Sequence, residues 1–167
     1  MSAGSAAGKV MVAAEAARAA HAWRESGEKV VLANGLFDLL HVGHVRYLEG
    51  AKALGTRLIV AVNGDRSAAR LKGPGHPVMP ALDRARLVAA LRSVDAVVVF
   101  EEATVEPLLL GLRPHVHAKG TDYSRETVPE RAAAESLGIE TAIAGDPKSH
   151  ASRDLLSRVR GRSSRSA

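Results

Sequence analysis

Two histidines three residues apart, His41 and His44, are the side chains of this sequence best suited to chemistry. They follow an apolar run at 30–33 and precede a helical pattern, which predicts that they lie in the first turn of a helix behind a buried strand. Imidazoles at that spacing lie on one side of a helix, beside backbone N–H groups that have no partner within the helix. Gly43 between them has no side chain to keep a phosphate from the backbone. The pattern predicts an anion-binding turn.

Two other interpretations of the histidine pair stay open from the spacing alone. The two imidazoles could be packed in the interior by chance. They could also bind zinc, but zinc prefers four ligands, and no further histidine or cysteine falls at ligand spacing. No metal site built by the protein itself is therefore expected.

The elements that must position this turn alternate regularly along the chain. Short apolar runs rich in β-branched residues are separated by helical patterns. Strands of that kind are buried on both faces, which predicts an α/β fold with about five parallel strands and helices on both faces of the sheet. The expected strands span 29–35, 57–63, 95–100, 115–120 and 140–146. The expected helices span 44–55, 81–94, 104–112, 129–138 and 152–159, and an extra helix over 6–26 is expected to pack on the outside.

Polar residues follow several of the expected strands. Ligands of parallel sheets bind at the carboxyl ends of the strands. Those ends carry Asn34 with Gly35, Asn63, Lys119 with Gly120, and Asp146. The Gly/Pro-rich segment 70–80 is the one long loop, and long loops inside compact domains are more often functional than decorative. A ligand site is expected where these features meet.

The composition fits one domain over 1–167, with its core at about 28–160. A chain of 167 residues with 46% hydrophobic residues can bury a substantial core without metals or crosslinks. The absence of cysteine excludes disulfides and thiol nucleophiles and agrees with a reducing compartment. No segment is long enough to cross a bilayer, so we expect a cytoplasmic protein without a membrane partner.

The net charge of +5 is concentrated at one end of the chain. Five arginines and one aspartate in the last fifteen residues contribute +4, which leaves +1 for residues 1–152. The segment 161–167 is small, polar and unpatterned, which is typical of a solvated tail, with a phosphate-binding arm as the alternative. Aromatic residues make up only 3% of the chain, which argues against a base-stacking surface. We therefore expect no nucleic-acid partner.

The stretch GLFDLLHVGH (35–44) resembles the G-x-F-D-x-x-H-x-G-H signature of the cytidylyltransferase-like nucleotidyltransferases. The resemblance continues through 60–91, through KGTDY (119–123) and through DPKSHASRDLL (146–156), so it covers about three quarters of the chain. Within that family the motifs look most like those of the standalone bacterial D-glycero-D-manno-heptose 1-phosphate adenylyltransferases.

The resemblance implies a Rossmann-like nucleotidyltransferase fold and a reaction. The phosphate of D-glycero-D-manno-heptose 1-phosphate would attack the α-phosphorus of ATP, giving ADP-heptose and pyrophosphate without a covalent enzyme intermediate. Such transfers are catalysed mostly by positioning and charge neutralisation, which fits a motif that supplies donors and cations but no nucleophile. Mg²⁺ is expected with ATP, because the side chains available do not offset the charge of both substrates. Relatives are commonly homodimers.

The resemblance also implies a role for each residue that matches the family's motifs. The residues expected to be catalytic are His41, His44 and Lys72, with Lys72 on the long loop closing over the phosphates. The residues expected to bind the nucleotide are Asn34, Gly35, Leu36, Phe37, His41, Gly43, His44, Arg84, Lys119, Gly120, Asp122 and Ser152. Those expected to bind the second substrate are Asp38, Asn63, Asp65 and Lys72.

Several of these roles have alternatives. Asp38 suits a helix cap as well as a substrate contact, and Arg84 suits an exposed helix charge. Asp65 and Asp122 could hold a ribose hydroxyl, Mg²⁺ or a neighbouring loop. Lys119 could bind substrate or phosphate, or be solvated.

The chain departs from the family's pattern at three positions. Ala151 precedes Ser152 where relatives carry two hydroxyl residues, Gly64 replaces a commoner polar residue, and His76 stands where an arginine is usual. The alternatives to the heptose reaction are transfer to glycerol 3-phosphate or phosphopantetheine, and a non-catalytic nucleotide-binding module. A nucleic-acid protein is disfavoured, since no Lys-Met-Ser-Lys-Ser-like loop is present.

Overall fold

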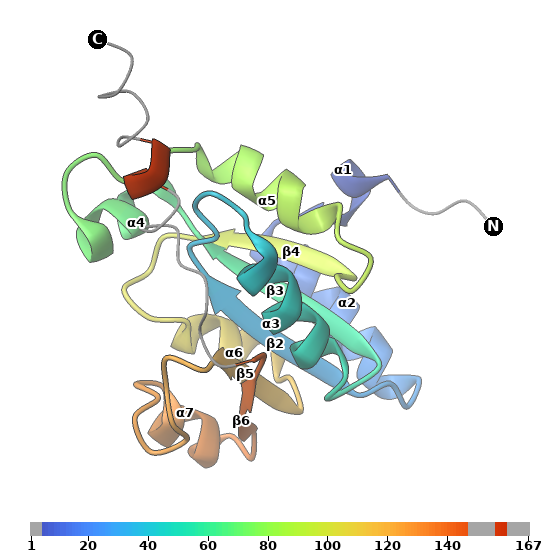
Figure 1. The fold of residues 1–167 in the computed structure, drawn as a ribbon. Helices are drawn as coiled ribbons and strands as arrows, with labels where there is room; N and C mark the ends of the chain where they lie inside the picture. Colours follow the sequence, from blue (N-terminus) through green and yellow to red (C-terminus); the bar gives the residue numbers. More distant parts are fainter. Residues whose placement is uncertain (1–4, 147–155, 160–167) are drawn as a thin grey trace, which may run out of the picture.

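The protein folds around one six-stranded sheet in which all strands are parallel. A computed structural model describes residues 5–146 and 156–159 (Figure 1). The strands are β1 (Val10–Met11), β2 (Val30–Gly35), β3 (Arg57–Asn63), β4 (Ala96–Phe100), β5 (Val116–Gly120) and β6 (Glu140–Ala144). The helices are α1 (Ala6–Lys9), α2 (Ala13–Glu25), α3 (Val42–Lys52), α4 (Asp65–Lys72), α5 (Ala81–Ala89), α6 (Glu106–Leu112) and α7 (Arg131–Ser136). Residues 156–159 are also helical.

Helices cover both faces of this sheet because its strands are apolar on both faces. On one face, α3 and α5 pack Leu48 and Val88 against side chains such as Val60. On the other, α2, α6 and α7 contribute Ala16, Leu109 and Ala134 to a second core. Figure 1 shows α3 in front of the sheet and α2 behind it. Alternate residues of a strand point to opposite faces, so each central strand contributes to both cores.

The strand order β1-β4-β3-β2-β5-β6 decides where a ligand can bind. From β2 the chain moves to β3 and β4 on one side, and later to β5 and β6 on the other. The connections therefore diverge beyond the carboxyl ends of β2 and β5, where a crevice opens in folds of this kind. The turn that carries the two histidines follows β2 directly.

The N-terminal end differs from the expectation in two ways: the sheet has six strands where about five were expected, and the helix expected over 6–26 is interrupted. Residues 10 and 11 are extended and pair with Val97 and Val98 of β4, which makes β1 a sixth strand and separates α1 from α2. The alanine-rich flanks favour a continuous helix, but the run Val-Met-Val at 10–12 is suited to an extended backbone when a strand is available beside it. Tertiary pairing therefore overrides the local preference.

The segment expected to be a loop over 70–80 begins later than predicted. Helix α4 continues to Lys72, so Lys72 is the last residue of a helix and the loop spans 73–80. Gly64 precedes this helix, and the backbone N–H of Ser67 in its first turn donates to Glu101 Oε2 at 2.9 Å. A Cβ at position 64 would lie 2.2 Å from that carboxylate. Gly64, one of the three departures from the family's pattern, therefore leaves space for the Glu101 carboxylate at the N-terminus of α4.

Candidate active site

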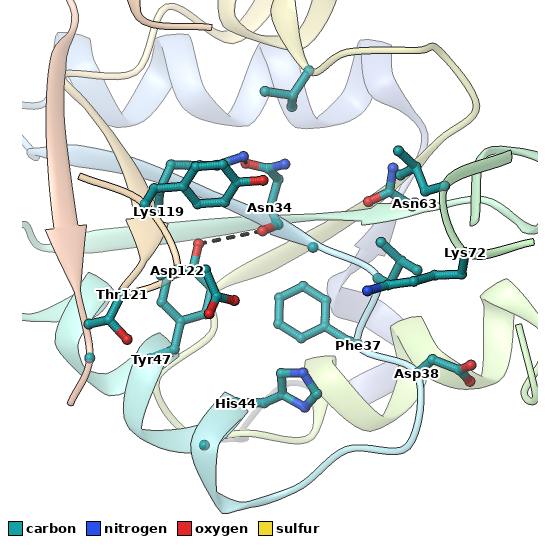
Figure 2. Close-up of a pocket in the computed structure, with 18 of the residues that line it drawn as sticks. Asn34, Phe37, Asp38, His44, Tyr47, Asn63, Lys72, Lys119, Thr121 and Asp122 are labelled. Atoms are coloured by element: carbon teal, nitrogen blue, oxygen red, sulfur yellow. Dashed lines mark hydrogen bonds between the residues drawn. The ribbon is translucent and has the colours of Figure 1, made fainter. Parts of the chain in front are cut away.

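A cavity of about 1260 Å³ lies at the carboxyl edge of the sheet. Ligand pockets commonly hold about 300–1,000 Å³, so this one has room for two substrates. Figure 2 shows side chains entering it from opposite sides, with Lys72 on one side and Lys119, Thr121 and Asp122 on the other. The predicted site residues that line it are Asn34, Gly35, Leu36, Phe37, Asp38, His41, Gly43, His44, Asn63, Lys72, Lys119, Gly120 and Asp122. Arg84 and Asp65 are not among the lining residues, and Ser152 lies outside the described residues.

The two histidines form the N-terminal turn of α3. His41 is the N-cap residue, and its Nδ1 accepts a hydrogen bond from the backbone N–H of Gly43 at 3.1 Å. The Nδ1 of His44 accepts from the backbone N–H of His41 at 3.3 Å. The two rings stack with their centroids 3.9 Å apart. The N–H groups of His41 and Gly43, expected to be open to a ligand, are therefore used by the histidines themselves.

This arrangement decides where the imidazole protons lie. An Nδ1 that accepts from a backbone N–H carries no proton, so the neutral ring holds its proton on Nε2. Both histidines therefore present an Nε2–H donor, and protonation of the ring leaves that donor in place. Two such donors beside the positive end of a helix suit an anion such as a phosphate.

Aromatic rings fix His44 from the side of the sheet. Phe37 is 3% exposed and meets His44 edge-on, with ring centroids 5.3 Å apart. Phe37 also stacks on Tyr47, whose hydroxyl donates to the backbone oxygen of Ala118 in β5 at 2.8 Å. Burial raises the pKa of the Tyr47 phenol, which therefore stays protonated as a donor. Tyr47 was missed from the sequence, although its position three residues after His44 places it on the same side of the helix.

Asp38 holds the long loop. The residues on both sides of it, Phe37 and Leu39, have φ of 51° and 56°, in the left-handed region that costs energy for residues other than glycine. This backbone turns the buried Asp38 carboxylate toward the loop, where it accepts from the backbone N–H groups of Val78 at 2.8 Å and Met79 at 3.1 Å. Asp38 is therefore not the cap of α3, since His41 has that position. Its contact with the second substrate stays a prediction.

Arg84 is buried and not exposed as a helix charge, and its position does not favour the predicted nucleotide contact. Its side chain is fully buried and donates to the backbone oxygens of Met79, Leu36 and Asn63. A fourth hydrogen bond joins it to Asp65 Oδ1 at 2.9 Å. Arg84 thus ties together the ends of β2 and β3, the loop and the first residue of α4. Asp65 therefore contacts a neighbouring segment of the protein through Arg84, which is the last of the three alternatives given for it above.

The end of β5 carries a buried polar cluster. Lys119 Nζ lies 3.5 Å from Glu130 Oε2, 3.4 Å from Asn34 Oδ1 and 4.8 Å from the ring centre of Tyr123. His117, on the same strand face, has its Nε2 3.0 Å from Asn34 Oδ1. Burial lowers the pKa of His117 to about 3, so this ring is neutral. Burial also lowers the pKa of Lys119, and the negative charge of Glu130 partly offsets this decrease.

Sequence reasoning missed His117 and Glu130. His117 stands two residues before Lys119, and the two-residue period of a strand could have placed both on one face. Glu130 lies beyond the loop that follows β5, and its sequence position gives no sign that it meets Lys119.

Comparison with known proteins agrees with this geometry. Residues 32–151 match the cytidylyltransferase-like family. The bifunctional protein HldE of Methylobacillus flagellatus is 50% identical over 121 residues, which cover 72% of this chain and 25% of that protein. HldE of Acidiphilium cryptum is 44% identical over 152 residues, which cover 91% of this chain and 31% of that protein. The chain thus spans about a quarter to a third of the length of these curated relatives.

Solved structures share the fold. A lipopolysaccharide core biosynthesis protein from Thermoplasma volcanium matches with a TM-score of 0.64 and 27% identity, over 73% of this chain and 100% of that one. Pantothenate synthetase from Thermus thermophilus matches with a TM-score of 0.61 over 86% of this chain and 63% of that one, and at 17% identity it shows the fold alone. The predicted Rossmann-like nucleotidyltransferase fold is confirmed, and the chain belongs to the cytidylyltransferase-like family of nucleotidyltransferases.

Proposed function

We propose that this domain transfers the adenylyl group of ATP to D-glycero-D-manno-heptose 1-phosphate, forming ADP-heptose and pyrophosphate. The observation that carries the proposal is the pair of Nε2–H donors on His41 and His44, set beside the switch point of the sheet in a cavity with room for two substrates. The choice of sugar rests on the resemblance of the motifs. The relative from Thermoplasma volcanium is described as a lipopolysaccharide core biosynthesis protein, which agrees with a sugar substrate.

In the proposed reaction, an oxygen of the sugar phosphate attacks the α-phosphorus of ATP. The new P–O bond forms as the bond to pyrophosphate breaks, and the electron pair of that bond leaves with pyrophosphate. No side chain needs to act as a nucleophile, so positioning and charge stabilisation carry the catalysis. His41 and His44 donate toward the α-phosphate and the leaving group, while Lys72 approaches from the side of the cavity opposite Lys119 (Figure 2).

Mg²⁺ is part of the proposal because two phosphorylated substrates carry more negative charge than these side chains offset. Among the described residues, no three histidine, aspartate or glutamate side chains are grouped so that they could hold a metal ion. Mg²⁺ bound chiefly by triphosphate oxygens and water needs no such group, so the residues present fit it. The exposed carboxylates of Asp122 and Asp146 on the cavity wall are the protein groups that would contact it. The ion would neutralise charge on the phosphates.

A panel of substrate pairs tests the proposal. The intact protein is incubated with Mg²⁺ and with ATP plus heptose 1-phosphate, CTP plus glycerol 3-phosphate, or ATP plus phosphopantetheine, and pyrophosphate release is measured. We expect the first pair to give the highest kcat/KM. Turnover with another pair would assign the chain to a different reaction of the same family. ATP binding without pyrophosphate release from any pair would identify a non-catalytic module, the alternative that Ala151 raises.

A further inference from the structure

The wall of the cavity at the end of β5 differs electrostatically from the histidine turn. Lys119 and Glu130 form an ion pair in it, and each side chain is only 7% exposed. Glu130 Oε2 is buried and accepts no hydrogen bond from the described residues, since Lys119 Nζ at 3.5 Å is an ionic contact. The pair contributes no net charge to the cavity, whereas elsewhere on the wall Lys72 supplies positive charge and the two histidines supply N–H donors.

The neighbours of this ion pair fix the direction of its hydrogen bonds. An ammonium group can only donate, so the Asn34 atom facing Lys119 is the amide oxygen. Nε2 of His117, which faces the same oxygen at 3.0 Å, must then be the protonated nitrogen. The amide nitrogen of Asn34 consequently points away from both groups, and it donates to no acceptor among the described residues. The wall therefore offers the donors of Asn34 and Lys119 next to the acceptor Glu130.

We propose that Asn34, Lys119 and Glu130 bind hydroxyl groups of a sugar ring and not a phosphate group. A hydroxyl both donates and accepts, so adjacent hydroxyls of a sugar can satisfy this mixed set. A phosphate only accepts at neutral pH, and it would meet the carboxylate of Glu130 next to its cation. The inference rests on the proposed function, because it divides the same cavity between phosphates and sugar. Of the roles predicted for Lys119, which included substrate and phosphate contacts, it favours contact with a sugar.

Two sugar rings could supply the hydroxyls: the ribose of ATP and the ring of the acceptor. The test therefore has two arms, read by calorimetric binding to the full chain. One arm compares ATP with 2′-deoxy-ATP and 3′-deoxy-ATP. The other compares heptose 1-phosphate with its 2-deoxy and 3-deoxy analogues in the presence of a non-hydrolysable ATP analogue. Inorganic pyrophosphate serves as the phosphate probe.

The decisive variant is Glu130→Gln, with Glu126→Gln as the matched control, because Glu126 is an exposed carboxylate in the same loop. We expect the wild type to bind at least one deoxy analogue about tenfold more weakly than its parent. Glu130→Gln should bring that ratio to within about twofold, because the amide is uncharged and presents a donor in place of one of the two carboxylate acceptors. Its affinity for pyrophosphate should be unchanged or higher, and Glu126→Gln should behave as the wild type.

A double variant covers the case in which Glu130→Gln does not fold. Lys119→Met with Glu130→Leu removes both charges, so no unpaired charge stays buried. It should lose the same discrimination and keep its affinity for pyrophosphate. Equal discrimination in wild type and variants, or a fall of about tenfold in pyrophosphate affinity, would overturn the inference. If the proposed function is wrong, no sugar 1-phosphate should be turned over, but the affinities for ATP and its deoxy analogues can still be compared.

Discussion

The imidazole protons of His41 and His44 are positioned by two backbone hydrogen bonds. Each Nδ1 accepts from a backbone N–H of the turn itself, so each ring has one defined tautomer and one defined direction for its donor. A preorganised donor needs no rearrangement as charge develops on a phosphate, and such donors account for large rate effects. The turn therefore uses histidine both as a helix cap and as a donor.

Replacement of His44 separates these two roles. We expect His44→Ala to lower kcat for pyrophosphate release at least about a hundredfold through loss of the Nε2 donor. It also removes the acceptor of the His41 N–H, which costs about 1 kcal/mol of unfolding free energy. In His44→Asn the side-chain oxygen can replace Nδ1 as acceptor, so stability should return while kcat stays low. A strongly destabilised His44→Ala variant with normal kcat would show that His44 is only a packing residue.

His117 should make the protein sensitive to acid. Its pKa of about 3 in the folded state is lower than the ordinary value of 6.5, so between these values the unfolded chain binds a proton that the folded chain does not. Stability from this group is therefore present above pH 6.5 and lost as the pH falls toward 3, by on the order of 4 kcal/mol.

Urea unfolding at pH 7 and pH 4 measures this loss. His117→Gln keeps a donor for Asn34 but does not titrate, so we expect its stability to fall less than that of the wild type over this interval. Parallel losses in the two proteins would mean that His117 accepts a proton in the folded state.

At the level of elements, the site depends on side chains that join separate segments. Asp38 connects the turn after β2 with the loop at 73–80, and Arg84 of α5 connects the ends of β2 and β3 with α4. Lys72 ends α4, so these contacts fix the segment that carries it. The hydrogen bonds of Arg84 favour a role in holding the loop in place over the predicted contact with the nucleotide.

A close approach of glycines holds α3 against the end of β6. A Cβ at Gly50 would lie 2.8 Å from the backbone nitrogen of Gly145, which leaves no space for a methyl group. We expect Gly50→Ala to destabilise the protein by about 1–3 kcal/mol in urea unfolding, although alanine favours a helix. A Cβ at Gly111 in α6 would meet no atom of the described residues within 4 Å, so Gly111→Ala should be neutral or stabilising by up to about 1 kcal/mol. Equal effects at both positions would contradict the close-packing explanation.

For the whole molecule, most of the excess positive charge comes from the C-terminal end of the sequence. The last fifteen residues contribute +4 of the net +5, and most of them lie outside the described residues. No helix in the described part of the chain is long and apolar enough to cross a membrane. The homodimer and the cytoplasmic location that the sequence suggested stay predictions.

Deletion of residues 161–167 tests the interpretation of the tail. We expect kcat and KM to change by less than about twofold, because this segment is predicted to be a solvated tail and lies beyond the last family motif, which ends at residue 156. The intact protein should bind nucleic acid only weakly and lose that binding as salt rises. Loss of turnover on truncation, or tight nucleic-acid binding at physiological salt, would identify the tail as a functional arm.

The parallel sheet and the helix that begins at the histidine turn were predictable from the sequence alone. Both follow from local features: β-branched apolar runs favour buried strands, and the G-x-F-D-x-x-H-x-G-H signature is confined to ten residues. The polar residues at the ends of β2, β3 and β5 were predictable in the same way, because a parallel sheet brings those ends to one edge.

Which polar groups pair at that edge depends on the packing of segments that are distant in the sequence. Lys119 meets Glu130 across a loop, Asp38 meets Val78 from forty residues away, and Val10 joins the sheet because β4 offers an edge. Each of these contacts joins residues that are far apart in the sequence, and the periodicity of a single helix or strand does not predict which distant segments pack together. Burial then changes the chemistry of the paired groups, since a charge removed from water needs a partner or must be given up. For that reason the sequence identified Lys119 as a ligand-binding cation, whereas the fold makes it one half of a neutral pair.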